Sequence, residues 1–303
     1  MNSVILPEIQ MLKYVLEVPG WTQERIAKEC ETTFATVNRW LNQGRKPHPA
    51  HAKNIERLFL KVVPFLSVIE DYKRKFPDPL HVIRNNPKVY KELIIQLTYY
   101  SNAIEGSTVT REETEKILYE KVFLDNRTQK EQQETVNHKQ AVEYVLKNAH
   151  KGFRVTEEYI RELHNMIVFA IDENRGEFRK EPVYLRNNIK TFPNSKGVPK
   201  LISNLVAGIE DREKNIISRA TLTHYEFEDI HPFADGNGRV GRLLMITQLL
   251  AEGYAPAIIR IEDRVRYMDA FRLADLRDYS PLILFIGESI IRGYSLLNSA
   301  GET

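Results

Sequence analysis

Apolar residues recur every three or four positions along most of the chain, and glycine and proline, 14 of each in 303 residues, seldom interrupt them. This spacing places apolar side chains on one face of a helix, so it predicts a mainly α fold. Thr110 and Glu113 have the spacing of a capping box, which predicts the start of a helix. The predicted helices cover residues 8–18, 23–30, 34–42, 50–61, 88–100, 111–119, 131–148, 157–170, 199–215, 219–230, 237–251, 264–276 and 281–297.

Two stretches rich in proline, glycine and asparagine, residues 42–49 and 74–87, predict loops or linkers. We therefore expect an N-terminal module over residues 1–65, a linker over residues 66–88 and a larger domain over residues 89–303. Inside the larger domain, residues 182–199 carry strand-like side chains and predict the one plausible β-hairpin of the chain.

Composition limits the classes of function. The formal net charge of +2 at pH 7 is small for this length, so bulk charge favours neither nucleic-acid nor membrane binding. The single cysteine, Cys30, cannot form an internal disulfide, which suits a reducing compartment. Neither a signal peptide nor an apolar run long enough to cross a bilayer is expected from the sequence. A soluble, cytoplasmic protein without a membrane partner is the expectation.

The segment HPFADGNGRVGR, residues 231–242, lies between two predicted helices and carries the most chemistry. Glycines on both sides of Asn237 let backbone N–H groups converge into an anion-binding nest at a helix N-terminus. Arg239 and Arg242 share one face of that helix, and arginine binds phosphate through several donors. Asp235 is a hard oxygen ligand for Mg²⁺, and His231 can take a proton near neutral pH. These parts suit phosphoryl or nucleotidyl transfer.

Other interpretations of this segment are weaker. The tetrapeptide Asp-Gly-Asn-Gly alone is typical of a tight turn. A calcium loop is disfavoured because Arg239 and Val240 stand where that loop needs an oxygen ligand and a glycine. A P-loop is disfavoured because the Lys-Ser/Thr pair is missing. The histidine, phenylalanine and two arginines around the tetrapeptide favour nucleotide chemistry over a plain turn.

The segment matches every position of H-x-F-x-(D/E)-G-N-G-R-x-x-R, and over roughly its last two-thirds the chain resembles the Fic family that bears this signature. The resemblance implies a Fic-type helical core with one small β-hairpin flap and AMPylation activity, the transfer of AMP from ATP to a protein hydroxyl with Mg²⁺ or Mn²⁺. Phe233 is expected to anchor the loop in the core. The resemblance implies that His231 accepts the proton and that Asp235 binds the metal ion. The backbone of Gly236, Asn237 and Gly238 would hold the α- and β-phosphates, assisted by the Asn237 side chain. Arg239 would bind the β-phosphate and Arg242 the γ-phosphate.

Two further parts of the site follow from the resemblance. The flap would lie within residues 176–192 and align the target protein by strand addition, with Val183 and Tyr184 on its first strand. A structural hairpin without a partner is the alternative. Tyr267 is similar to the aromatic residue that lies near the adenine base, although Met268 and residues 275–278 depart from the family pattern. A core role for Tyr267 is the alternative.

The stretch SNAIEG, residues 101–106, matches the pattern (S/T)-x-x-x-E-(G/N) of the family's inhibitory helix, expected here over about residues 92–106. Ser101 and Glu105 share one face of that helix. The resemblance implies that Glu105 pairs with Arg242, so that ATP binds with its α-phosphate misaligned for attack. An ordinary helix end at Gly106 is the alternative. A second hypothesis is that Glu105 positions water for removal of AMP.

The N-terminal module resembles lambda-repressor-like helix–turn–helix domains within residues 21–49. The match is partial, because Glu31 stands where a turn glycine is usual, and Glu29 and Glu31 put negative charge close to the DNA. A module for dimerisation or target docking is the alternative. The residues expected near DNA are Gln23, Thr33, Phe34, Ala35, Asn38, Arg39, Arg45 and Lys46.

Together these features predict a protein adenylyltransferase that modifies a target protein or itself and is inhibited by Glu105. One alternative is transfer of another phosphate-containing group, such as UMP, phosphocholine or phosphate. Another is a DNA-binding regulator, acting through residues 1–65, whose Fic core senses nucleotide. A homodimer is expected from the habit of the family and from the symmetry of helix–turn–helix recognition.

Overall fold

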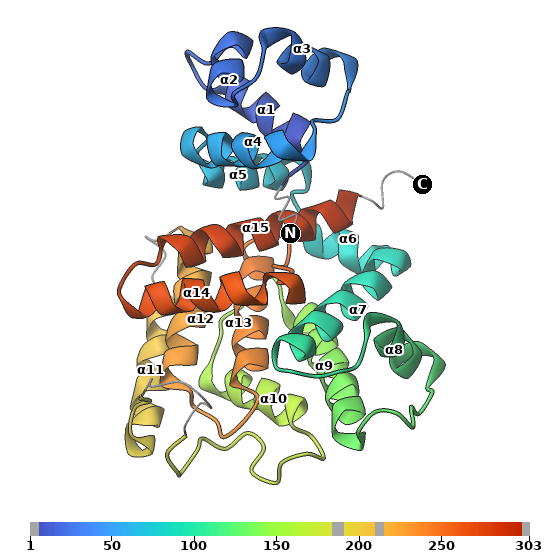
Figure 1. The fold of residues 1–303 in the computed structure, drawn as a ribbon. Helices are drawn as coiled ribbons and strands as arrows, with labels where there is room; N and C mark the ends of the chain where they lie inside the picture. Colours follow the sequence, from blue (N-terminus) through green and yellow to red (C-terminus); the bar gives the residue numbers. More distant parts are fainter. Residues whose placement is uncertain (1–5, 184–190, 210–214, 299–303) are drawn as a thin grey trace. The chain divides into compact units, whose positions relative to one another are not determined.

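The computed structural model describes residues 6–183, 191–209 and 215–298, and these ranges contain helices and loops with no strand (Figure 1). The chain divides into two compact units, Met1–Lys75 and Phe76–Thr303. The prediction of a mainly α fold is confirmed.

In its described part, the N-terminal unit packs its helices around a small apolar core. Helix α1 packs on α4, and α2 packs on α3. The centre of the core is formed by fully buried aliphatic and aromatic side chains, among them Leu12, Ile26, Val37, Phe59 and Ile69. The helices are α1 (Glu8–Glu17), α2 (Gln23–Glu29), α3 (Phe34–Gln43), α4 (Pro49–Val62) and α5 (Phe65–Lys75).

Helices α2 and α3 begin in the same way, with a threonine as cap. The side chain of Thr22 accepts a hydrogen bond from the backbone N–H of Arg25, and that of Thr33 from the N–H of Thr36. Between the helices, Glu31 has a φ of 52°, in the left-handed region that glycine usually fills. The turn between α2 and α3 therefore forms without a glycine, at the cost of some backbone strain.

The predicted linker over residues 66–88 is helical in the structure. Helix α5 belongs to the N-terminal unit, whereas α6 (Pro79–Asn85) and the start of α7 (Pro87–Ile104) belong to the C-terminal unit. The prolines suggested a linker, but Pro79 and Pro87 stand in the first turn of a helix, where a missing N–H costs nothing. The boundary between the units lies at residue 75 rather than across a linker.

Helix α13 (Asn237–Ala251) is the central helix of the C-terminal unit, and all of its residues except Gly238 are buried. Four helices pack around it: α7, α9 (Gln129–Asn148), α10 (Glu157–Ile167) and α12 (Ile216–Ile230) (Figure 1). The remaining elements are α8 (Arg111–Glu115), the π-helix η1 (Lys116–Glu120), the 3₁₀ helices η2 (Ser195–Gly197) and η3 (Ile261–Asp263), α11 (Val198–Ile209), α14 (Arg264–Asp275) and α15 (Ser280–Asn298). The capping box of Thr110 and Glu113 is confirmed at the start of α8.

Helix α15 contradicts the expectation that no apolar run of the chain is long enough to cross a bilayer. It is the one helix in the described ranges that is long and apolar enough to cross a membrane, with a mean hydropathy of 1.2. However, 67% of that window is buried inside the protein, as in the core helix of a globular domain. Glu288 in its middle is fully buried and paired with Arg266.

The predicted β-hairpin is not seen. Residues 176–183 and 191–194 form loop without strand pairing, and Val183 in this loop is half-buried. Tyr184 and the rest of the predicted hairpin, up to residue 190, lie outside the described residues. A flap that binds a target strand therefore stays a prediction.

Candidate active site

The loop between α12 and α13 is shaped by Asn237. Its side-chain oxygen accepts a hydrogen bond from the N–H of Phe233 at 2.9 Å, and its side-chain nitrogen donates to the Phe233 carbonyl at 2.9 Å. Gly236, with a φ of 79°, is the N-cap residue just before α13. The Asn237 amide is thus used to close the loop, whereas the resemblance assigned it to phosphate. Its backbone N–H is the more direct donor for that role, because the side-chain oxygen and one side-chain hydrogen are already bonded to Phe233.

Phe233 anchors the same loop in the core, as predicted. Its ring is fully buried and stacks face to face on the imidazole of His164, with 3.7 Å between ring centroids. Nδ1 of His164 accepts the N–H of Gly176 at 2.8 Å, so its Nε2 carries the hydrogen and donates to the Asp235 carbonyl at 3.2 Å. Burial lowers the pKa of His164 to about 4, which keeps this ring neutral. The pattern in the sequence gave no sign of His164.

His231 ends α12 in the left-handed conformation, with a φ of 48°. Arg179 fixes this backbone: its Nε donates to the His231 carbonyl at 2.7 Å, and its own N–H donates to the Pro232 carbonyl at 2.8 Å. The His231 ring is 15% exposed and lies against Phe192, while Nδ1 is 3.9 Å from a carboxylate oxygen of Glu228. One edge of the imidazole therefore faces a carboxylate.

Asp235 lies at the entrance of the loop with its carboxylate half exposed. One oxygen accepts the N–H of Gly236 at 2.6 Å and Nη2 of Arg239 at 3.3 Å, and the other is 3.5 Å from Nζ of Lys130. Burial opposes ionisation, but Arg239, Gly236 and Lys130 outweigh it and lower the pKa of Asp235. Asp235 is therefore a carboxylate at neutral pH, available to a cation.

Arg239 is almost fully buried, with a side chain 4% exposed. Its Nη1 is 3.0 Å from a carboxylate oxygen of Glu134 on α9, and its Nη2 contacts Asp235. The guanidinium lies between two carboxylates. The resemblance assigned Arg239 to the β-phosphate, but in this structure its contacts are with the protein, and it holds Asp235 in place.

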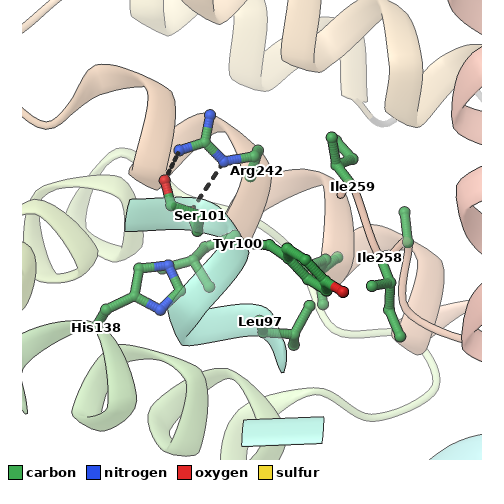
Figure 2. Close-up of a pocket in the computed structure, with 10 residues that line it drawn as sticks. Leu97, Tyr100, Ser101, His138, Arg242, Ile258 and Ile259 are labelled. Atoms are coloured by element: carbon green, nitrogen blue, oxygen red, sulfur yellow. Dashed lines mark hydrogen bonds between the residues drawn. The ribbon is translucent and has the colours of Figure 1, made fainter. Parts of the chain in front are cut away.

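Arg242, one turn further along α13, is held by the end of α7. Its Nη2 lies 2.8 Å from a carboxylate oxygen of Glu105 and 2.9 Å from the Ser101 carbonyl, and its Nε donates to Ser101 Oγ at 2.9 Å (Figure 2). Burial disfavours the charge on Arg242, whereas Glu105 and the other partners of the guanidinium favour it. Their combined effect outweighs burial and raises the pKa of Arg242. The predicted pairing of Glu105 with Arg242 is present, and the structure adds Ser101 as a further partner of Arg242.

The carboxylate of Glu105 also lies on the N-terminus of α13. A β-carbon added at Gly238 would overlap the Glu105 carboxylate, and Gly238 is the second residue of that helix. A helix N-terminus binds anions through its unsatisfied N–H groups and its dipole. Glu105 thus stands where an anionic group can bind both the helix end and Arg242.

Helix α7 ends in a Schellman motif around Gly106, which has a φ of 103°. The N–H of Ser107 donates to the Asn102 carbonyl and that of Gly106 to the Ala103 carbonyl, the two bonds that define this cap. Gly106 is therefore an ordinary helix end, and this end holds Glu105 in place. The helix end is therefore confirmed, whereas inhibition by Glu105 stays a prediction.

Comparison with known proteins finds a family match for part of the chain. Residues 154–249 match the model of the Fic/DOC family. This segment is a Fic domain. Curated relatives named protein adenylyltransferase Fic are 32% identical over 202 residues in Drosophila mojavensis and 31% identical over 233 residues in Culex quinquefasciatus, covering 65% and 75% of this chain. The chain spans 40% and 46% of those relatives, less than half of their length.

Solved structures agree with the fold of the Fic domain. A Fic domain-containing signalling protein from Bacteroides thetaiotaomicron aligns with a TM-score of 0.68 at 23% identity, covering 76% of this chain and 98% of that one. A Fic family protein from Desulfovibrio desulfuricans aligns with a TM-score of 0.66 at 25% identity, covering 79% and 74%. Fic-1 from C. elegans aligns with a TM-score of 0.66 at 20% identity, covering 92% and 84%.

Tyr267, which lies after the matched segment, does not line an open site in the structure. Its ring is 2% exposed and packs against Phe285, and its hydroxyl is hydrogen-bonded to Nε2 of His224. Burial raises the pKa of Tyr267, which keeps the hydroxyl protonated. The core role, which the sequence left open, describes the position of Tyr267 better than contact with adenine.

Helix α9 supplies site residues that sequence reasoning missed. Lys130 and Glu134 are one turn apart, and their side chains contact Asp235 and Arg239. Glu131 accepts the N–H and hydroxyl of Thr108, both at 2.7 Å, and so ties the chain after the inhibitory helix to α9. In the sequence, the spacing of these charged residues places them on one face of a helix, but it does not show which residues that face contacts.

In the N-terminal unit, outside the Fic match, the residues expected near DNA are spread along α2 and α3. Phe34 at the start of α3 is 46% exposed. Asn38 donates to the side chain of Gln23 at 3.3 Å, and Arg39 donates to the Ala35 carbonyl and to Thr36. Thr33 caps α3. DNA binding stays a prediction.

Proposed function

We propose that the chain is a protein adenylyltransferase that transfers AMP from ATP to a hydroxyl side chain of a target protein or of itself. The observation that carries the proposal is the contact of Glu105 with Arg242, the last residue of a segment that matches the Fic signature at every position. A carboxylate held by a helix end and an arginine marks an anion site. The names of the relatives support ATP as the donor.

The donor set fits a nucleotide polyphosphate. Gly238 has no side chain, and a β-carbon there would fill the space now taken by the Glu105 carboxylate. Backbone N–H groups at the start of α13 and the guanidinium of Arg242 offer donors to several phosphate oxygens. With Glu105 withdrawn, the same donors are available to the phosphates of ATP.

The donor set also fits a divalent cation that arrives with the phosphates. Asp235 offers one ionised carboxylate, and within the described ranges no group of three acidic, histidine or cysteine side chains could hold an ion by itself. Mg²⁺ commonly takes one or two carboxylates and completes its shell with phosphate oxygens and water. When bound, the cation would neutralise phosphate charge, and Asp235 would hold it after Lys130 moves away.

His231 is suited to take the proton of the target hydroxyl. Its Nδ1 faces the carboxylate of Glu228 at 3.9 Å, which favours the tautomer with hydrogen on Nδ1. Nε2 is then the ring nitrogen that takes the proton. Arg179 fixes the backbone of His231 through its carbonyl, so the ring is held at the end of α12. A base that is fixed in position keeps the reacting atoms aligned.

The inhibition follows from the same contacts. Arg242 is the ligand proposed for the γ-phosphate, and Glu105 and Ser101 now take its Nε and Nη2 donors. A nucleotide that cannot use Arg242 binds in a shifted pose, and small displacements of reacting atoms cost large factors in rate.

The test is labelling with ATP radioactive at the α-phosphate, with the protein alone and with cell lysate. Glu105→Gly is expected to raise labelling at least roughly tenfold, because small improvements in alignment give large rate gains. Glu112→Gly, at an exposed position of α8, is the matched control and should leave labelling at the wild-type level. Adding His231→Ala to Glu105→Gly should abolish labelling. Labelling that survives this change would contradict the proposal.

The identity of the donor needs a separate experiment. With Glu105→Gly, ATP, UTP and CDP-choline labelled in the transferred group are compared on the same target. The proposal expects ATP to be preferred. Preference for another donor would leave the proposed phosphate site unchanged, but would mean that the activity is transfer of UMP or phosphocholine.

A further inference from the structure

A small cavity adjoins the contact between Ser101 and Arg242. Its volume is about 20 Å³, and its walls come from α7, α9, α13 and the segment Ala257–Ile259. Most of the lining is aliphatic. The polar groups that reach it are Ser101, Tyr100, His138 and Arg242 (Figure 2).

His138 is the unusual member of this lining. Its side chain on α9 is 1% exposed, and neither ring nitrogen has a hydrogen-bond partner among the described residues. Burial, followed by the charges of Arg242 and Arg239, lowers the pKa of His138 well below its ordinary value. A neutral imidazole has one N–H donor and one nitrogen acceptor, and buried groups of this kind nearly always have partners.

Ser101, on the facing helix, has an unused donor. Its hydroxyl oxygen accepts from Arg242 Nε at 2.9 Å, and in the described part of the chain no acceptor is found for its own O–H. Figure 2 shows Ser101 between Arg242 and His138 in that view. A donor on Ser101 and an acceptor on His138 therefore line the same cavity without meeting.

One water molecule needs a cavity of about 10–15 Å³ and at least two polar groups as hydrogen-bond partners. This cavity meets both conditions. We propose that it is a binding site for a single water molecule, which accepts the hydroxyl hydrogen of Ser101 and donates to His138. The water orients the Ser101 oxygen so that its lone pair faces Arg242, and His138 is a positioning residue of the inhibited state.

The consequence for regulation rests on the proposed function. Removing the acceptor on His138 leaves the water without its second partner and lets the Ser101 hydroxyl rotate. The bond from Arg242 Nε to Ser101 then weakens, and Arg242 is released more often from Glu105. One hydrogen bond corresponds to roughly a fivefold change in an equilibrium.

The experiment compares three variants with Glu105 present. His138→Leu fills the site without a polar atom and is expected to raise labelling by ATP roughly fivefold, as for one lost hydrogen bond. His138→Gln keeps a donor and an acceptor and should return labelling towards wild type. Thr98→Val is the matched control, because Thr98 is another buried α7 hydroxyl without a partner but does not line the cavity. In the Glu105→Gly background, His138→Leu should change nothing.

A readout independent of activity keeps the inference separate from the proposed function. A crystal structure of the wild type should show one density peak within hydrogen-bond distance of Ser101 Oγ and a His138 nitrogen, and His138→Leu should lack it. If the cavity is dry in the wild type, or if His138→Leu leaves labelling unchanged and only raises the melting temperature, the water site is wrong. If Glu105→Gly shows no labelling with any donor, the proposed function fails while the crystal structure still decides the water site.

Discussion

Arg179 Nε lies 2.7 Å from the carbonyl oxygen of His231, so a buried guanidinium holds the backbone of the proposed base while its ring stays directed at the site. Three further bonds fix the same side chain and its backbone: Nη2 donates to the Pro193 carbonyl at 2.6 Å, Nη1 to the Glu181 carbonyl at 3.2 Å, and the Arg179 N–H to the Pro232 carbonyl at 2.8 Å. Arg179 therefore joins the end of α12 to the loop over residues 176–183.

Arg179→Lys is expected to lower the rate constant of labelling roughly tenfold or more in the Glu105→Gly background, because one point charge cannot replace a forked donor. The apparent Kd for ATP should change little, since Arg179 contacts His231 and not the proposed phosphate site. Single-turnover labelling at several ATP concentrations separates the two quantities. A change confined to ATP affinity would show that Arg179 acts elsewhere.

Asn237→Ala should destabilise the C-terminal unit. The change leaves the N–H and the carbonyl of buried Phe233 without their side-chain partner, and each orphaned group costs about 1–3 kcal/mol. The free energy of unfolding is measured with urea, monitored by circular dichroism. Asn215→Ala, at the exposed start of α12, removes a helix cap instead and should cost about 1 kcal/mol. Equal losses for the two variants would contradict the role given to Asn237.

Ser101→Ala should release the inhibition only in part. It removes the bond from Arg242 Nε to Ser101 Oγ but keeps the Ser101 carbonyl and Glu105 as partners of Nη2. Labelling is expected to rise roughly fivefold, less than with Glu105→Gly, as for one hydrogen bond. A larger effect than that of Glu105→Gly would mean that Ser101, and not Glu105, is the main inhibitory residue.

The acid stability of the protein should depend on Glu131. Its partial burial opposes ionisation, but hydrogen bonds from Thr108 and Thr128 are stronger in sum and lower its pKa to about 2. A depressed pKa in the folded state contributes stability above the unfolded pKa, near 4.3, and this stability is lost as the pH falls towards 2. Glu131→Gln should therefore reduce stability at pH 7 and flatten its dependence between about pH 4.5 and 2. An unchanged slope in denaturant titrations over this window would contradict the assignment.

Cys30 should report unfolding of the N-terminal unit alone. The thiol is fully buried in that unit, and burial raises its pKa to about 11, so it is protonated and shielded at neutral pH. Ellman's reagent should react with the native protein only at the rate of local opening, and rapidly in denaturant. Fast stoichiometric reaction under native conditions would show that the unit opens readily.

The sequence alone predicted the helices and the signature loop because both depend on local pattern. Apolar spacing identified α9, α12 and α13, and the pairing of Arg242 with Glu105 came from two motifs more than 130 positions apart. The prediction of a linker over α5 and α6 was wrong, because Pro79 begins a helix and does not interrupt one. Whether a proline starts a helix depends on the cap before it, here Asp78.

The contacts that the sequence could not give are those between elements. Arg179, His164 and Glu134 carry no motif, and their roles arise only when α9, α10 and the loop before η2 meet the start of α13. Tyr267 shows the reverse case, in which a residue matched a family position but packs in the core. Partner identity is a property of tertiary packing, which periodicity does not encode.

If Glu105 inhibits the protein as proposed, its position at the end of α7 predicts a low basal activity. Glu105 is carried by the last turn of α7, and last turns of helices fray more easily than their interiors. The share of time that this single turn is unwound would set the turnover of the resting enzyme. The activity would then rise gradually with temperature, with a substitution at Gly106 or with a partner that binds the unwound turn, while the rest of the domain stays folded.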